Sequence, residues 1–172
     1  MTGPTFFTTT ESPIGRLLLT STDKGISGLF MQDHKGGRSP EPDWITSRDH
    51  FTAVISQLRA YFAGELRDFD LALDLHGTPF QLQVWNALLD IRFGETRSYA
   101  DLARAIGNPS AVRAVGLANG RNPVSIVVPC HRVIGSDGSL TGYGGGLDRK
   151  RFLLDLEARV AGDRVLQPSL LA

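Results

Sequence analysis

Cysteine is almost absent from this sequence: Cys130 is the only one among 172 residues. A single thiol cannot form an internal disulfide or supply a cysteine-rich metal site, so it is either a buried structural thiol or a nucleophile. Its surroundings favour a nucleophile, because His131 follows it directly and an apolar run at 124–128 precedes it. A thiol attacks as its thiolate, and a nearby base or positive charge has to promote that ionisation.

Long hydrophobic runs are also missing, since no apolar stretch is long enough to span a bilayer. No basic residue precedes the short apolar patch near the N-terminus, which argues against a secretory signal. Together with the scarcity of cysteine, these absences lead us to expect a cytoplasmic protein without a membrane partner.

Charge of one sign is not in excess over the whole chain, whose formal net charge is zero. The two parts differ, however: residues 1–76 carry a net charge of −3 and residues 77–172 a net charge of +3. This asymmetry is either chance or a mild preference of the second part for a polyanionic partner.

The first part has the pattern of a small α+β domain over residues 1–76. Two β-rich runs, 16–22 and 26–31, are separated by turn residues, and the polar stretch 33–49 predicts a loop. Apolar residues at helical spacing from Phe51 to Phe62 predict a helix. Residues 67–75 alternate strictly between apolar and polar, which predicts a strand with one face in solvent.

The second part, residues 77–162, has mainly helical signals. Thr78 predicts an N-cap, and Ser98 with Asp101 predicts a capping box that opens a second helix. A third helix is predicted over Ser110–Asn119, and two short helices joined by about three residues fit a helix-turn-helix. Six glycines lie between residues 135 and 146, where they allow sharp turns or close contact with a ligand, or simply form a flexible loop.

A last helix is predicted from Asp148. Its inward-facing residues are expected to be Phe152, Leu153, Leu156 and Val160. Residues 163–172 are expected to form a loose tail.

Glu157 on this last helix is a candidate partner for His131. Its helical neighbours three and four positions away are all apolar, so the carboxylate either faces inward or reaches solvent at the helix edge. A buried carboxylate needs a hydrogen-bonding partner, and His131 would complete a Glu–His–Cys relay. Adjacent side chains on an extended segment point to opposite faces, so either a turn at Pro129 reorients Cys130 and His131 or a water links them.

Other polar residues have two possible roles each. Arg113 lies in the middle of a helix of small residues, where it could reach a phosphate or a base stack, or stay a solvated surface arginine. Tyr99 could donate a phenolic proton to a ligand or belong to the core. The other histidines, His34, His50 and His76, lack metal-ligand spacing, and we expect them at the surface without a metal.

These features together resemble the O6-alkylguanine-DNA alkyltransferases, also called methylated-DNA–protein-cysteine methyltransferases, over residues 78–157. The matching segments are 94–99, 114–116, 121–123, 128–133 and 142–146, and Pro-Cys-His-Arg-Val at 129–133 is the most specific of them. The first part, with Tyr-Phe-Ala-Gly at 61–64, resembles the family's N-terminal domain more loosely. The resemblance implies an α+β protein, with a small ribonuclease-H-like N-terminal domain (an antiparallel sheet plus a helix) and a mainly helical, winged-helix-like C-terminal domain.

The resemblance implies direct reversal of DNA damage. The O6-alkyl group of guanine, and also the methyl group of O4-methylthymine, would pass irreversibly from duplex DNA to Cys130, once per protein molecule. The alkylated oxygen lies in a stacked base, so the base has to be flipped out, toward a thiolate at the mouth of a cavity that fits a purine. No cofactor and no obligate protein partner are implied, and the zinc site of some relatives is not expected, since its region has no cysteine.

The resemblance also implies individual residue roles. His131 would deprotonate Cys130 through a bridging water while Glu157 orients it, Tyr99 would assist departure of guanine, and Asn122 would be a hinge. The implied DNA-contacting residues are Ser110, Ala111, Arg113, Ala114, Gly116 and Asn119, with Arg113 replacing the flipped nucleotide. The implied base pocket comprises Pro129, Val133, Tyr143 and Gly144, together with the carbonyls of Cys130 and Val133.

Two other functions fit part of the pattern. A protein that binds alkylated DNA without repairing it would need no nucleophile, and Cys130 is present. A thiol hydrolase would use Cys130, His131 and Glu157 with turnover, but it explains neither the helix-turn-helix nor the lack of oxyanion-stabilising groups.

Overall fold

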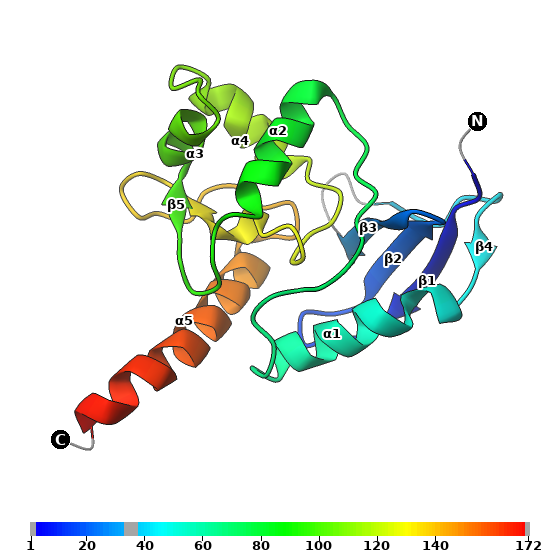
Figure 1. Cartoon of the computed structure of the whole chain (residues 1–172), viewed down its shortest axis with the longest axis horizontal. Coiled ribbons are helices and arrows are strands. Elements are labelled where there is room, and N and C mark those ends of the chain that lie inside the picture. Colours follow the sequence, from blue (N-terminus) through cyan, green and yellow to red (C-terminus); the bar gives the residue numbers. More distant parts are fainter. Residues whose placement is uncertain (1–2, 33–37, 171–172) are drawn as a thin grey trace.

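The computed structural model describes residues 3–32 and 38–170. A sheet with one helix on it forms an N-terminal unit, a cluster of shorter helices forms a C-terminal unit beside it, and the last helix extends away from both (Figure 1). The α+β fold class is therefore confirmed. In the described ranges, no helix is long and apolar enough to cross a membrane.

The N-terminal unit is built on a four-stranded sheet. Its strands are β1 (Phe6–Thr10), β2 (Leu17–Thr22), β3 (Gly25–Met31) and β4 (Ile45–Thr46), in the order β3-β2-β1-β4. The first three strands pair antiparallel, as predicted, but β4 pairs parallel to β1, so the sheet is mixed. The sequence predicted only a loop over 33–49, because a two-residue strand is too short to show a period; residues 33–37 lie outside the described part.

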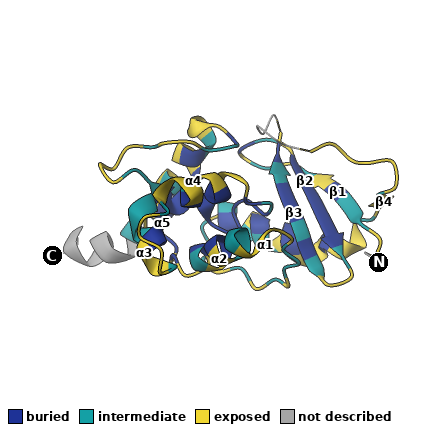
Figure 2. Cartoon of the chain, turned by 90° about the horizontal axis from the view of Figure 1, so that it is seen from above, coloured by how far each residue is buried: buried dark blue, intermediate teal, exposed yellow. Residues whose placement is uncertain are grey.

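One helix covers the sheet. After a short 3₁₀ helix, η1 (Asp49–Phe51), helix α1 (Thr52–Phe62) lies across one sheet face and ends before Gly64, as its spacing predicted (Figure 1). Buried residues of α1, including Val54, Leu58 and Tyr61, join Leu17 and Leu19 of β2 in one apolar core. The burial of these faces is visible in Figure 2.

The strand predicted over 67–75 does not form. This segment is extended and keeps its alternation, with Phe69, Leu71 and Leu73 half-buried. Its pairing with β3 is limited to one bridge, between Leu73 and Ile26. In this bridge Ile26 N donates to Ala72 O (2.9 Å), and Asp74 N donates to Ile26 O (2.8 Å). The alternation was right about which side chains face the core, but a strand also needs a neighbouring edge along its length, which β3 does not offer.

The C-terminal unit begins with helix α2 (Pro79–Leu88), followed by β5 (Arg97–Ser98), α3 (Tyr99–Ala105) and α4 (Val112–Gly120). The predicted N-caps are confirmed: the Thr78 side chain accepts from Gln81 N, and the Ser98 side chain accepts from Asp101 N. Helix α4 starts two residues later than predicted, because Ala111 N is held by Asn108 O in a turn. Helices α3 and α4 pack on each other and on α2, as a helix-turn-helix requires.

The final segments run from η2 (Cys130–Arg132) through β6 (Val133–Ile134), which pairs parallel to β5, into helix α5 (Leu147–Leu170). Leu153 and Leu156 are buried as predicted, but Phe152 is exposed and Val160 only half-buried, because both lie at the edge of the buried stripe. Helix α5 continues to Leu170 instead of giving way to a loose tail at 163. A single glycine such as Gly162 costs a helix only about 1 kcal/mol, which does not end it.

Backbone hydrogen bonds join the two units beside the cysteine. Leu29 N of β3 donates to Pro123 O (2.9 Å), and Ser125 N donates to Leu29 O (3.3 Å). The segment that leads from α4 to Cys130 is therefore fixed to the edge of the N-terminal sheet.

Candidate active site

Cys130 opens the 3₁₀ helix η2 directly after a tight turn at Pro129. In this turn Cys130 N donates to Val128 O (2.8 Å), and Arg132 N donates to Pro129 O (3.0 Å). The turn decides between the two alternatives left open by the sequence: the segment is not extended, and Cys130 and His131 both face inward. Cys130 is 5 % exposed and His131 is fully buried.

His131 is held by the carboxylate of Glu157 on α5. Its Nε2 donates to Glu157 Oε2 across 2.5 Å, and both side chains are buried. This contact fixes the tautomer, so Nδ1 carries the free lone pair. Nδ1 is buried and has no protein hydrogen-bond partner among the described residues, which leaves it available as a base.

Two further donors that sequence reasoning missed reach the same carboxylate. Arg132 Nε lies 2.6 Å from Glu157 Oε1, and Tyr61 of α1 donates its hydroxyl to Oε2 across 3.3 Å. The guanidinium is fixed in turn by Ile91 O, which accepts from Arg132 Nη1 across 2.6 Å. Arg132 stands in the most specific matching segment, which was a usable signal, but nothing in the sequence links Tyr61 to a glutamate 96 positions away.

Burial and charge set the protonation states of these groups. Burial raises the pKa of the Cys130 thiol, although the Asn122 side chain and the charge of Lys150 oppose the rise. Burial lowers the pKa of His131, which keeps the imidazole neutral. Burial alone would raise the pKa of Glu157, but the hydrogen bond and charge of His131 and the charge of Arg132 lower it overall.

The sulfur is therefore not the exposed anion that the sequence led us to expect. It is a buried thiol, protonated in the resting protein because a thiolate is poorly solvated there. A neutral imidazole with a free Nδ1 stands next to it in the chain, so ionisation has to accompany attack on a substrate.

Asn122 shapes the segment that carries Cys130. Its Nδ2 donates to Val128 O (2.7 Å), and its Oδ1 accepts from Val124 N (3.0 Å). Between these two anchors Ile126 has a φ of +73°, and Val127 N donates to Ser125 O across 2.9 Å, which describes a strained γ-turn. A β-branched residue in this region costs of order 1–3 kcal/mol, and the Asn122 bridge helps to hold it there.

Lys150 is a second buried cation that the sequence analysis overlooked. The side chain is fully buried, and Nζ donates to Val133 O (2.6 Å) and Thr141 O (3.0 Å). Burial lowers its pKa, while the nearby Cys130 opposes that shift. Its position seven residues before Glu157, on the same helix face, was a signal that could have identified it.

The glycine-rich loop lies over this site. Tyr99 on α3 donates its hydroxyl to Thr141 O across 3.1 Å, so it contacts the loop in the absence of a substrate. The hydroxyl of Tyr143 is buried without a protein partner among the described residues, and burial raises its pKa. Val133 O already accepts from Lys150, but a carbonyl has a second lone pair for a base.

The six predicted DNA-contacting residues, which lie on α4 or just before it, fall into an exposed and a buried group. Ser110, Arg113 and Ala114 are exposed, and Ala111 is half-exposed. Asn119 lies on the inner side instead: its side chain is buried, and its Nδ2 donates to Cys130 O across 3.4 Å. Its contact with DNA stays a prediction.

Gly116 is also turned inward. It is half-buried beneath the ring of Tyr99, whose Cδ1 would lie 3.7 Å from a Cβ at this position. Helical periodicity accounts for both cases, since half of a packed helix has to face the core. Leu117, by contrast, is 60 % exposed on the same helix and was not predicted.

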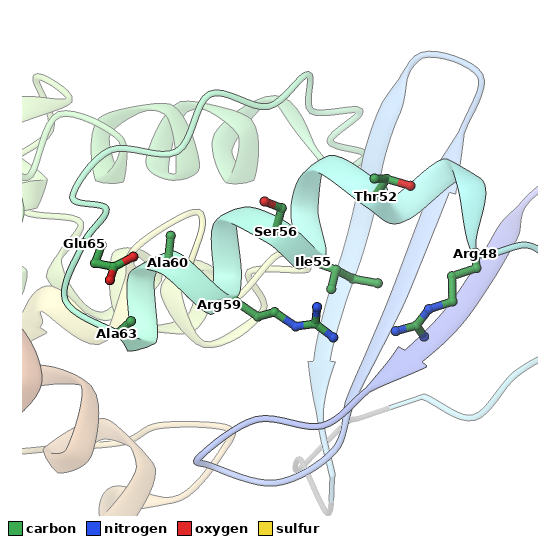
Figure 3. Close-up of a pocket in the computed structure, with 8 residues that line it drawn as sticks. All are labelled: Arg48, Thr52, Ile55, Ser56, Arg59, Ala60, Ala63 and Glu65. Carbon is green, nitrogen blue, oxygen red and sulfur yellow. The ribbon is translucent and has the colours of Figure 1, made fainter.

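One groove lies on the N-terminal unit, away from the cysteine. A groove of about 590 Å³ runs along α1, where Arg48 and Arg59 point toward each other (Figure 3). All its lining residues belong to the N-terminal unit. A crevice of about 270 Å³ between the units includes Pro129, which was expected in the base pocket, and Arg132.

The structure shows no metal centre in its described part, where no group of three or more His, Cys, Asp or Glu side chains could hold an ion. His50 and His76 are exposed as predicted, and His34 lies outside the described residues.

Comparison with known proteins gives matches over nearly the whole chain. Residues 79–159 match the family described as "6-O-methylguanine DNA methyltransferase, DNA binding domain", and residues 5–75 match "6-O-methylguanine DNA methyltransferase, ribonuclease-like domain". The methylated-DNA–protein-cysteine methyltransferase of Mycolicibacterium paratuberculosis is 54 % identical over 156 residues, covering 89 % of this chain and 92 % of that protein. The protein of that name from Methanosarcina acetivorans is 54 % identical over 148 residues, covering 86 % of this chain and 94 % of that protein.

A solved structure agrees with these matches. The crystal structure of Mycobacterium tuberculosis OGT in complex with DNA superimposes with a TM-score of 0.85 at 52 % identity, covering 90 % of this chain and 94 % of that one.

Proposed function

The chain belongs to the 6-O-methylguanine DNA methyltransferase family, and we propose that Cys130 is the residue to which it transfers the alkyl group. The protein is an alkyl-transferring DNA repair enzyme of the methylated-DNA–protein-cysteine methyltransferase type, and its partner is DNA. The observation that carries the assignment to Cys130 is the buried relay in which Glu157 holds His131 Nε2 and leaves Nδ1 free.

The residues present account for each step of the transfer. His131 Nδ1 takes the proton of the Cys130 thiol, and the sulfur attacks the alkyl carbon in a direct displacement. A sulfur–carbon bond forms as the carbon–O6 bond breaks, and the guanine leaves after a proton from the Tyr99 hydroxyl reaches its ring. Tyr99 then recovers a proton from His131, so that the thiol proton is carried overall to the guanine.

Irreversibility follows from the product. The S-alkylcysteine is a thioether, with neither a thiol proton nor a good leaving group, so each molecule reacts once. Ionisation coupled to attack also protects the resting thiol, because a protonated sulfur reacts slowly with other electrophiles.

DNA recognition is proposed to use the exposed side of α4. Flipping a base out of the stack costs a few kcal/mol, and we propose that the exposed side chain of Arg113 fills the vacated position. Its neighbours Ser110 and Ala114 are small, so the helix can come close to a groove. Contacts of this kind read the backbone more than the sequence, so we expect little preference for flanking bases.

The experiment that tests the assignment is a mass measurement. The protein is mixed with duplex DNA containing O6-methylguanine, digested with trypsin and weighed, and one methyl group per protein is expected on the peptide that contains Cys130. Duplexes with O4-methylthymine test the second proposed lesion in the same way. Turnover beyond one per molecule would instead indicate a hydrolase, and tight binding without a mass gain would indicate a non-catalytic binding protein.

The Cys130→Ala variant provides the control. It should keep the DNA affinity of the parent and lose transfer entirely, and repair by this variant would show that the nucleophile is a different residue. Because the acceptor thiol has to stay reduced, we also propose a cytoplasmic location.

A further inference from the structure

One oxygen of the Glu157 carboxylate is shared between the two units of the protein. Oε2 accepts from His131 Nε2 (2.5 Å) in the C-terminal unit and from the Tyr61 hydroxyl (3.3 Å) in the N-terminal unit. Arg132 Nε donates mainly to Oε1 (2.6 Å) and also lies 3.2 Å from Oε2. The oxygen that orients the proposed base thus has one donor that comes from a different folding unit.

Tyr61 has little freedom to move its hydroxyl. The side chain is fully buried, and its ring packs against those of Phe62 (centroid distance 5.3 Å), Phe69 (5.4 Å) and Phe93 (6.0 Å). Phe93 belongs to the C-terminal unit, so the tyrosine is clamped from both sides. A ring held in this way places its hydroxyl at a defined point, which a flexible polar side chain would not do.

The titratable and charged groups near this oxygen are His131 and Arg132 on η2, Tyr61 on α1 and Lys150 two turns earlier on α5. Arg67 stacks on the ring of Phe93 and donates to Val160 O. Three of these side chains donate directly to the carboxylate: His131, Arg132 and, through its hydroxyl, Tyr61.

We propose that Tyr61 is a positioning residue for alkyl transfer, through which the N-terminal unit fixes the Glu157 oxygen that holds His131. This inference rests on the proposed function of Cys130 and assigns a role in the reaction to a residue of the N-terminal unit. Tyr61 is proposed to act only by restraining Glu157, with which it shares a hydrogen bond.

Two consequences follow for the reaction. Without the hydroxyl, Oε2 is less restrained, so the imidazole is held less well in the orientation that receives the thiol proton. The negative charge that the hydroxyl stabilised is then left to His131 and Arg132, and its stronger pull on the imidazolium raises the pKa of His131. If the role of Tyr61 were purely structural, its loss would slow transfer only by unfolding the protein. It would not raise the pKa of His131.

The experiment compares the parent with Tyr61→Phe, which keeps the ring and removes only the hydroxyl. Single-turnover rate constants for methyl transfer are measured at saturating duplex DNA from pH 5.5 to 9, and the Kd for the duplex is measured separately. We expect the rate constant at neutral pH to fall about three- to tenfold, the range that one hydrogen bond accounts for. The acidic limb of the pH–rate profile should move to higher pH, and the Kd should not change.

Val54→Ala is the matched control. Val54 is fully buried on the same helix and belongs to the apolar core, so this variant lowers stability without touching Glu157. It should show the parent's rate constant and pH profile below its melting temperature. The inference is overturned if Tyr61→Phe gives the parent's rate constant and profile, or if Val54→Ala slows transfer and shifts the profile equally. The mass gain of the parent on Cys130 tests the proposed function independently of either variant.

Discussion

Lys150 Nζ donates a 2.6 Å hydrogen bond to the carbonyl of Val133, three residues beyond Cys130, from a side chain that is fully buried. The same ammonium donates to Thr141 O in the glycine-rich loop (3.0 Å). One buried cation thus connects helix α5, the end of the active-site turn and the loop over it, and its charge also opposes the rise in the pKa of Cys130.

The Lys150→Met variant is expected to fold but to react slowly. Methionine removes the desolvation cost of the buried charge but leaves the carbonyls of Val133 and Thr141 without this donor, so we expect a moderate loss of stability. Loss of the positive charge raises the pKa of Cys130 further, so the transfer rate constant should fall about tenfold, which corresponds to about 1.4 kcal/mol. Single-turnover kinetics and urea unfolding measure the two effects, and a variant with the parent's rate would exclude Lys150 from thiolate stabilisation.

The Glu157→Gln variant should lose both stability and activity. It leaves Arg132 as a buried cation without its carboxylate, and breaking a buried pair in this way costs about 3–5 kcal/mol. Glutamine offers one amide oxygen where the carboxylate offers two charged ones, so His131 and Arg132 compete for it and the tautomer of His131 is less well fixed. Transfer should therefore slow at temperatures where the variant is still folded. Calorimetry and single-turnover assays at low temperature would separate these losses; a variant as stable as the parent would show that the pair contributes little.

The stability of the parent should fall as the pH decreases from neutral. The pKa of His131 is lowered in the folded protein, whereas it is about 6.5 in the unfolded chain. Between these two values the unfolded chain binds a proton that the folded protein does not, so the free energy of unfolding decreases by up to about 1.4 kcal/mol per pH unit.

Urea unfolding at pH 7.5 and 5.5 tests this dependence, with His131→Gln as the comparison. The variant should show a smaller difference between the two pH values than the parent does. The lowered pKa of Glu157 acts at lower pH, because its stabilisation is lost only below about 4.3. Equal differences in parent and variant would mean that His131 does not carry the effect.

Arg113→Ala should slow repair without changing stability. Arg113 is exposed, and surface substitutions of this kind change stability by about 0.5 kcal/mol at most. Arg59→Ala is the control, because Arg59 is an exposed arginine on α1 in the N-terminal unit (Figure 3). Repair rates on an O6-methylguanine duplex and melting temperatures measure the outcome, and equal effects of the two variants would indicate only a general charge effect.

Leu117→Gln tests whether an exposed apolar side chain on α4 also contacts DNA. Leu117 lies one turn beyond Arg113 and is 60 % exposed. If it packs against the groove, the polar variant should bind duplex DNA about three- to tenfold more weakly at unchanged melting temperature. An unchanged Kd in a fluorescence-anisotropy titration would show that the exposure has no role in binding.

Local signals in the sequence predicted much of the fold. The caps at Thr78 and Ser98 depend only on residues three positions away, and the turn between β2 and β3 lies within a few residues. The strand expected over 67–75 failed because pairing depends on a partner edge, which is a long-range property. Likewise, the periodicity of 110–119 predicted a helix there but did not say which half of it faces the core, and only the structure shows that Asn119 is on the buried half.

For the candidate site, the sequence by itself determined the nucleophile candidate and its adjacent histidine, because these follow from the number of cysteines and from adjacency. Helical spacing made Glu157 a candidate partner, and the tertiary structure decided that it faces inward. Only the tertiary structure decided that the sulfur is buried and protonated, that Lys150 lies beneath the loop, and that Tyr61 shares an oxygen with His131. The physical reason is that solvation and pairing of a buried charge depend on groups brought together from distant parts of the chain, and no local pattern records which groups those are.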